Sequence, residues 1–307
     1  MKHILFLLLF VIIACNNETN IINEDYLRTD NSYELDIPLS GSLQNPAFSP
    51  DSKSIVFTRF VNGYNKEPAE LYVYNLETKK LRLLVADGSG NVNLPGSCWV
   101  GDKIVFSSSR EPHDEIYIIN ADGKPGDEVQ ITSRDDFVAY EPSFSPDGKW
   151  ISFESHRLDV EDSGVICKYK VDGSGNYIRL TDPGQDCRQP NWSPKGNEIV
   201  YQKFKDNNWS IWIADTSGGF NRNVTNEKAD YTDISYMPDG NYVVFSYSFS
   251  ANIYKLRILG GTLIQLTESV MEYDGAPSVS PDGTKLAFES CEGEPDNSAG
   301  TKIRLLD

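Results

Sequence analysis

The chain has 307 residues, of which 39% are hydrophobic and 24% charged, values ordinary for a soluble globular protein of one large or two smaller domains. Its formal net charge of −17 at pH 7 would repel DNA or RNA, so we expect no nucleic-acid partner. Short β-branched and aromatic runs are broken by Gly, Pro, Asn and Asp, and long amphipathic helical patterns are scarce. The sequence therefore predicts an all-β fold.

The chain begins with a segment typical of an export signal. Lys2 is followed by an apolar run over residues 4–14 and then by Cys15. The run is too short to span a bilayer stably but fits the core of a signal peptide. The stretch Ile12-Ile13-Ala14-Cys15 resembles the lipobox of bacterial lipoproteins, in which the Cys is lipidated and becomes the mature N-terminus. We expect lipidation at Cys15, and the alternative is an ordinary secretory signal with an incidental Cys.

A polar segment over residues 16–32 follows, without a periodic apolar pattern, and it predicts a flexible tether. Acyl chains, not surface charge, would then hold the protein at a membrane. Asn16 indicates the outer membrane under the sorting rule of enterobacterial lipoproteins. The expected organisation is a signal peptide (1–14), a lipidated tether (15–32) and one folded domain (33–307).

One phrase recurs through the rest of the chain. Residues 143–155 read SFSPDGKWISFES, residues 278–290 read SVSPDGTKLAFES, and four weaker copies begin at residues 47, 98, 191 and 235. A second segment of two short apolar runs around a turn follows, as in NIYKLRILGGTLIQLT. Four strands in about 45 residues is the period of a β-propeller blade. The six copies predict a six-bladed β-propeller with four antiparallel strands in each blade.

The last copy stops after its third strand, which would leave sheet edges open. The stretch at about residues 33–39, YELDIPL, resembles the last strand of a blade running into the next phrase. We therefore expect this N-terminal strand to complete the sixth blade. Within the phrase, Asp147 and Asp282 are expected to cap the backbone of the Ser-Pro-Asp-Gly turn, not to act as catalytic acids.

The pattern xFSPDGxxIxFxS…IYxxxxDGxxxxxLT resembles the TolB-type WD40-like β-propeller repeat over nearly all of residues 33–307. The resemblance implies the fold and leaves the activity open. TolB carries an α/β domain before its propeller, and we expect a form without that domain. Related peptidases add a hydrolase domain, but no GxSxG motif is present. Oligogalacturonate lyases of similar repeats use a His-rich metal centre, whereas only His113 and His156 follow the signal, so we expect no metal or cofactor.

Candidate binding residues follow from aligning the copies. In a propeller, the loop into the innermost strand and the loop out of the second strand share one face, the channel mouth. Aligned positions there mix both charges with Tyr, as recognition surfaces do. The alternative is that they are merely solvated loop side chains. The candidates are Arg59, Arg110, Tyr140, Glu141, His156, Arg157, Arg188, Gln189, Lys203, Tyr231, Asp233, Tyr273 and Asp274.

Other residues have simpler interpretations. Trp99 and Trp192 replace the Phe of the phrase and are expected in the core between blades. Cys167 and Cys187 fall near one end of blade 3, where a disulfide and free buried thiols both remain open.

The sequence therefore predicts an exported lipoprotein of the cell envelope whose propeller binds a protein or peptide partner without catalysis. An alternative is a propeller that binds or degrades glycans, with acidic residues such as Glu141 and Asp233 as paired carboxylates. A third possibility is a purely structural partner in an envelope complex.

Overall fold

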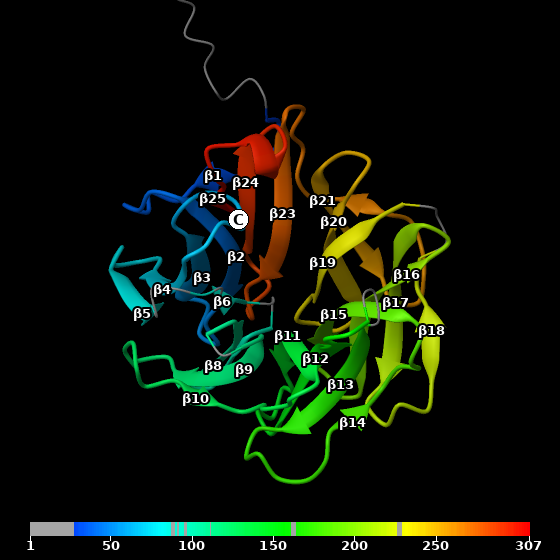
Figure 1. The fold of residues 1–307 in the computed structure, drawn as a ribbon. Helices are drawn as coiled ribbons and strands as arrows, with labels where there is room; N and C mark the ends of the chain where they lie inside the picture. Colours follow the sequence, from blue (N-terminus) through cyan, green and yellow to red (C-terminus); the bar gives the residue numbers. More distant parts are fainter. Residues whose placement is uncertain are drawn as a thin grey trace, which may run out of the picture.

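The computed structural model describes residues 28–307 except 87–89, 91, 95–96, 111, 161–163 and 226–228. Cys15 and the expected signal peptide lie outside these residues. Six antiparallel sheets surround a central axis (Figure 1), which confirms the six-bladed β-propeller. Among the described residues, the one helical element is a 3-10 helix, η2 (Pro295–Asn297), and no helix is long and apolar enough to cross a membrane.

The first three blades each arise from one continuous stretch of chain. Blade 1 contains β2 (Ser42–Phe48), β3 (Ser54–Phe60), β4 (Ala69–Asn75) and β5 (Leu81–Ala86). Blade 2 contains β6 (Val92–Asn93), β7 (Trp99–Val100), β8 (Lys103–Ser108), β9 (Glu115–Asn120) and β10 (Val129–Gln130). Blade 3 contains β11 (Phe137–Phe144), β12 (Trp150–Arg157), β13 (Val165–Lys170) and β14 (Ile178–Arg179).

The next two blades repeat this order, and the last joins both ends of the described chain. Blade 4 contains β15 (Asp186–Trp192), β16 (Glu198–Lys205), β17 (Asn208–Asp215) and β18 (Asn221–Asn223). Blade 5 contains β19 (Tyr231–Tyr236), β20 (Tyr242–Tyr247), β21 (Asn252–Arg257) and β22 (Ile264–Gln265). Blade 6 contains β23 (Glu272–Val279), β24 (Leu286–Glu292), β25 (Lys302–Leu306) and β1 (Tyr33–Glu34).

The second strand of each blade is apolar because both of its faces are covered by neighbouring blades. In β3, Ile55, Val56 and Phe57 are fully buried. Full burial of such a side chain stabilises the fold by about 1.5–3 kcal/mol. Trp192 is buried in a core cluster that also contains Ile166 of blade 3, as expected for a place between blades, and Trp99 is partly buried against a neighbouring core cluster.

The repeated Asp holds the turn between the first two strands. Asp147 Oδ1 accepts hydrogen bonds from Ser145 Oγ (2.7 Å) and from the backbone N–H of Lys149 (3.1 Å). Asp282 makes the same contacts, which lower its pKa to about 2. These Asp side chains are turn caps, as expected, and the turns lie at the end of the propeller opposite the mouth.

The N-terminal strand closes the ring as predicted. In β1, Tyr33 pairs with Leu305 and Glu34 with Arg304 of β25. The backbone N–H of Leu35 then donates to Ile303 O at 2.9 Å. Leu35 is buried against this blade, so the sixth sheet gains its fourth strand from the start of the chain.

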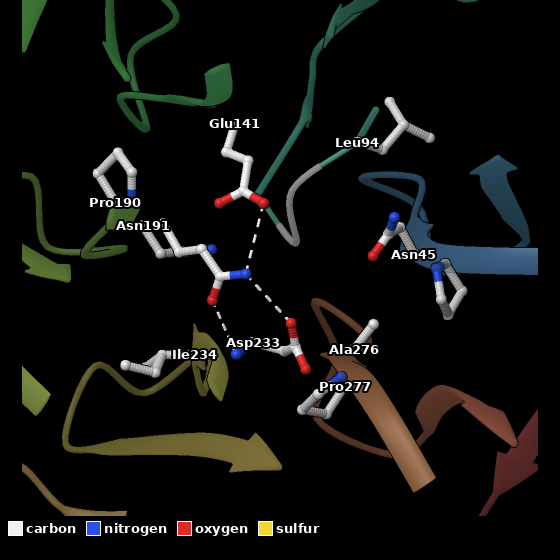
Figure 2. A pocket seen from close by; sticks show the side chains of 11 residues that line it. Asn45, Leu94, Glu141, Pro190, Asn191, Asp233, Ile234, Ala276 and Pro277 are labelled. Atoms are coloured by element: carbon white, nitrogen blue, oxygen red, sulfur yellow. Dashed lines mark hydrogen bonds between the residues drawn. The ribbon is translucent and has the colours of Figure 1, made fainter. Parts of the chain in front are cut away.

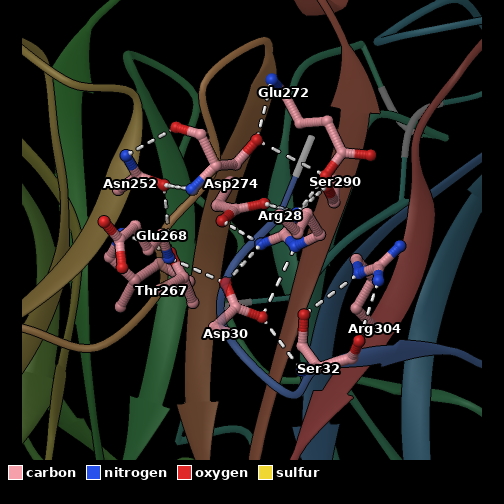
Figure 3. A network of polar contacts seen from close by, with 12 residues as sticks. Arg28, Asp30, Ser32, Asn252, Thr267, Glu268, Glu272, Asp274, Ser290 and Arg304 are labelled. Carbon is pink, nitrogen blue, oxygen red and sulfur yellow. Dashed lines mark hydrogen bonds and ion pairs between the residues drawn. The ribbon is translucent and has the colours of Figure 1, made fainter. Parts of the chain in front are cut away.

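Residues 28–32, expected in the tether, also contact the propeller. Figure 3 shows Arg28 among the carboxylates of Asp30, Glu272 and Asp274, with Arg28 Nη2 2.6 Å from Asp274 Oδ2. The Arg28 side chain is 5% exposed and that of Asp274 is 0% exposed. This segment is therefore anchored beside the junction of blades 5 and 6.

The four cysteines in the described part of the chain, Cys98, Cys167, Cys187 and Cys291, are free and buried. Of the two alternatives for Cys167 and Cys187, the structure has the free thiols. Burial raises the pKa of Cys167 to about 11, so it is an unreactive thiol at neutral pH.

Candidate functional site

The innermost strands of five blades carry a β-bulge at one equivalent position. Pairing with the second strand shifts register there, and the residue in the bulge has a left-handed backbone. Such a backbone costs about 1–3 kcal/mol at a residue other than Gly, and it tends to occur at functional sites. The bulge residues are Asn45 (φ 51°), Glu141 (46°), Gln189 (51°), Asp233 (54°) and Ala276 (47°).

These bulge residues surround a small cavity inside the central channel (Figure 2), which we call the throat. Its volume is about 40 Å³. The sequence alignment had placed Glu141, Gln189 and Asp233 at equivalent positions, and the structure brings all three to this cavity. The corresponding Pro95-Gly96 of blade 2 lies outside the described residues. The throat is lined by Asn45, Pro46, Leu94, Glu141, Gln189, Pro190, Asn191, Asp233, Ile234, Ala276 and Pro277.

The amide of Gln189 connects the two acidic residues of the throat. Its Nε2 lies 3.4 Å from Glu141 Oε1 and 3.2 Å from Asp233 Oδ1. Its Oε1 accepts the backbone N–H of Asp233 at 2.8 Å and a bond from the amide of Gln202. Because both ends of the amide are bonded, the side chains of three adjacent blades are held in one arrangement.

A second ring of polar residues supports the first, and the sequence analysis did not assign it a role. It follows the buried aromatic residue of every second strand. Glu154 Oε2 accepts the backbone N–H of Gln189 at 2.8 Å, and Glu289 Oε2 accepts that of Asn45 at 3.1 Å. These carboxylates thus join one blade to the next. The ring consists of Thr58, Ser107, Glu154, Gln202, Ser246 and Glu289.

Tyr64 reaches this ring from the mouth-face loop between β3 and β4. Its hydroxyl donates to Glu289 Oε1 at 3.3 Å and contacts Tyr273, a predicted site residue. Tyr273 in turn needs Gly275, because a Cβ there would lie 2.3 Å from the Tyr273 hydroxyl oxygen. Tyr64 could not be found from the repeat, because the loops that leave the second strands differ in length and sequence from one copy to the next.

The carboxyl groups of the throat are held in a buried, acidic environment. Burial raises the pKa of Glu141 well above its usual range, and the charges of Glu154 and Asp233 raise it further. Burial, with Asp233 as the next cause, raises the pKa of Glu289 to about 8. Such shifts indicate that the charged form of each group lacks a compensating positive partner among the described residues, and they are common at functional sites.

The predicted basic residues are placed at the mouth end of their blades, but each has a local partner. These contacts reduce the positive charge they present to the channel. The contacts are Arg59–Glu70 (2.8 Å), Arg110–Glu128, His156–Glu154 (3.2 Å), Arg157–Asp159 (2.9 Å), Arg188–Asp186 (2.8 Å) and Lys203 over the ring of Trp212 (4.2 Å).

Three further candidates point away from the throat. The Tyr140 hydroxyl donates a hydrogen bond to Asp114 of blade 2. Burial raises the pKa of Tyr140 to about 12. Tyr231 is buried against Phe245, with ring centroids 5.3 Å apart. Asp274 is fully buried and paired with Arg28. The structure therefore gives these side chains packing, hydrogen-bond and ion-pair contacts away from the throat.

Exposed apolar side chains surround the mouth on blades 3 to 6. They lie at the end of the second strand β16, in the loops that leave other second strands, and in the connection into β23. Phe249 is 72% exposed and Val270 is 81% exposed, so both present most of their apolar side chain to solvent. We call this group the rim; it consists of Leu158, Val160, Phe204, Phe249, Val270 and Met271.

The opposite end of the channel has a different character. A cavity of about 290 Å³ opens there among residues of the repeated phrase and its turns. Its lining includes Trp99, Phe144 and Trp192 together with four turn prolines, and no charged residue. Elsewhere in the described chain, no group of three or more His, Cys, Asp or Glu side chains is placed to hold a metal ion.

The sequence matches the TolB beta propeller domain family over residues 39–248 and 165–296, so the chain belongs to this family. The Tol-Pal system protein TolB of Francisella tularensis subsp. holarctica is 31% identical over 161 residues. That match covers 52% of this chain and 35% of the relative, so the chain corresponds to about a third of the relative's length.

Two solved structures share the fold at low sequence identity. TolB from Acinetobacter baumannii superposes with a TM-score of 0.60 at 17% identity, over 87% of this chain and 64% of that one. An oligogalacturonate lyase from Vibrio parahaemolyticus gives a TM-score of 0.56 at 15% identity, over 86% of this chain and 76% of that one. The architecture is thus shared by TolB and by a lyase, so the fold alone does not determine the function of this chain.

Proposed function

We propose that this protein is a lipid-anchored component of the cell envelope whose propeller binds a protein or peptide partner at its mouth, without catalysis. The observation that carries the proposal is the rim, where large apolar side chains such as Phe249 stand exposed around a polar channel. Interfaces bury apolar and aromatic residues at their centre within polar surroundings. The lipobox-like stretch ending at Cys15 supports the anchor, and similarity to a Tol-Pal system protein supports membership of a multiprotein system.

The glycan alternative has less support. Glu141 and Asp233 form a carboxylate pair, but both are tied to Gln189 in a cavity of about 40 Å³. This volume accommodates a few water-sized groups and is too small for a sugar ring between the two carboxylates. Although the chain shares its fold with the lyase, the cavity between Glu141 and Asp233 lacks the space that a sugar ring needs.

The proposal can be tested by capturing partners from detergent-solubilised envelope membranes. The full chain is compared with a rim variant, Phe204→Ser/Phe249→Ser, and with a matched variant of the opposite face, Phe220→Ser/Leu259→Ser. Phe249 and Leu259 are 72% and 74% exposed on the same blade, so the two substitutions remove similar exposed areas.

We expect the wild type and the opposite-face variant to retain one shared partner, and the rim variant to lose it. If the rim variant captures the partner as well as the wild type does, the partner does not bind at the mouth. Circular dichroism of each variant serves as the control for folding.

A further inference from the structure

The throat gathers carboxylates around a neutral group. Glu141 and Asp233 both approach the amide nitrogen of Gln189, at 3.4 and 3.2 Å, and an amide does not compensate two negative charges. Oε2 of Glu141 is buried and has no hydrogen-bond partner. Figure 2 shows this carboxyl group directed into the cavity. A buried carboxylate oxygen without a partner is unfavourable unless a bound group satisfies it.

The protein's own cations do not complete this site. The described residues that line the throat include no Lys, Arg or His. The two basic side chains near Glu141 and Glu154 are engaged: Arg188 forms an ion pair with Asp186 at 2.8 Å, and His156 lies 3.2 Å from Glu154. Among the described residues, none therefore places a positive group at the centre of the throat.

The size of the throat limits which cation fits. A cavity of about 40 Å³ holds a few water-sized groups. An ammonium group is of this size and donates several hydrogen bonds from one atom. A planar guanidinium is wider, and a metal ion needs more converging ligands than the described residues provide here.

We propose that the throat binds a primary ammonium group of the partner, with Glu141 Oε2 as its main acceptor and Asp233 as the second carboxylate. The group is a lysine side chain or a free amino terminus. Binding would place a positive charge beside Gln189 and satisfy the unpartnered oxygen. This inference rests on the proposed function for its choice of a peptide as the source, while the site itself stands on the geometry of the throat.

Nuclear magnetic resonance titration of the ¹⁵N-labelled full chain tests the site with small probes. Nα-acetyl-lysine N-methylamide offers only the side-chain ammonium, and alanine N-methylamide only the amino-terminal one. The norleucine analogue of the first probe lacks the charge, and tetramethylammonium is a cation without N–H donors. The readout is the backbone amide shifts of Asn45, Gln189 and Asp233.

We expect one of the two ammonium probes to give saturable shifts at these amides and both controls to give none. Glu141→Gln should weaken binding about tenfold or more, whereas Glu77→Gln, at an exposed turn, should leave it unchanged. Equal shifts from the norleucine analogue, or unchanged affinity in Glu141→Gln, would overturn the inference. Because the wild-type comparison with norleucine needs no variant, the result does not depend on how Glu141→Gln folds.

The outcome is independent of the partner-capture experiment. If the rim variant loses the partner while ammonium probes bind nowhere, the proposed function stands and the ammonium site falls. If the probes bind but the rim variant keeps its partner, the site stands and the mouth interface falls.

Discussion

Glu289, in the second strand of the last blade, accepts a hydrogen bond from the backbone N–H of Asn45, in the innermost strand of the first blade, at 3.1 Å. The two residues are 244 positions apart in the chain. This contact joins the blades on either side of the ring closure, beside the pairing of β1 with β25. It also fixes the bulge that places Asn45 at the throat. One buried carboxylate thus serves both the fold and the shape of the channel.

Replacing Glu289 with Ala should therefore destabilise the protein. The backbone N–H of Asn45 and the hydroxyl of Tyr64 would lose their acceptor in a buried place, at a cost of about 1–3 kcal/mol. Urea unfolding measures the change. Glu77→Ala, on an exposed turn, serves as the control and should alter the free energy of unfolding by less than about 0.5 kcal/mol. Equal effects of the two substitutions would contradict a joining role for Glu289.

Glu289 should also make stability depend on pH. Its pKa rises from the ordinary 4.5 to about 8 in the folded state, where it faces Asp233, Tyr64 and the N–H of Asn45. Between these values the folded protein keeps a proton that the unfolded chain releases. The free energy of unfolding therefore falls as pH rises from about 4.5 to about 8, by at most about 1.4 kcal/mol per pH unit from this group.

Glu289→Gln removes this titration while keeping an acceptor for Asn45. Denaturant unfolding at a series of pH values should show the variant gaining stability relative to the wild type as pH rises through this window. A constant difference between the two proteins across the window would show that Glu289 keeps an ordinary pKa.

Removing only one partner of the Arg28–Asp274 ion pair should destabilise the fold more than removing both. Arg28→Met leaves the fully buried carboxyl of Asp274 without its cation and should cost about 3–5 kcal/mol. In Arg28→Met/Asp274→Asn, part of this loss should be recovered, because the fully buried charge of Asp274 is removed while Asp30 and Glu272 still lack their cation. Arg157→Met breaks an exposed pair with Asp159 and should leave the free energy of unfolding nearly unchanged. Failure of the double variant to recover stability would mean that Arg28 acts mainly through packing on Phe288.

Lipidation at Cys15 can be measured directly by metabolic labelling. Cells grown with an alkyne-tagged fatty acid should label the wild-type protein, and Cys15→Ser should lose the label, since the acyl groups are attached at this residue alone. Asn17→Ser should keep it. Persistent labelling of Cys15→Ser would point to another attachment site and would separate the anchor from the lipobox-like stretch.

The repeated phrase was sufficient to predict the ring and its closure. Aligning the copies placed Glu141, Gln189 and Asp233 at one level because a bulge recurs at one position in the repeat. The same alignment could not tell which neighbours face the channel. Alternate residues of a strand point to opposite sides, so Tyr231 and Asp274 lie between blades.

Other parts of the site were beyond reach because they depend on single contacts outside the repeat. Tyr64 comes from a loop whose length and sequence differ among the copies, and Arg28 belongs to a segment whose polar composition resembles a tether. The supporting role of Glu154 and Glu289 had a signal, a polar residue after the aromatic one in all six second strands. That these carboxylates accept hydrogen bonds from the backbone of the next blade, however, can be seen only from how the blades are placed in three dimensions.

Site-specific photo-crosslinking most directly tests the claim that the mouth is the binding face. A benzophenone amino acid is placed at position 249 on the rim or at position 239 in a turn beside the cavity at the opposite end. After irradiation of intact cells, the account predicts an adduct of one defined mass at position 249 and none at position 239. An adduct at position 239 alone would show that the partner uses the opposite end of the channel and would contradict the account.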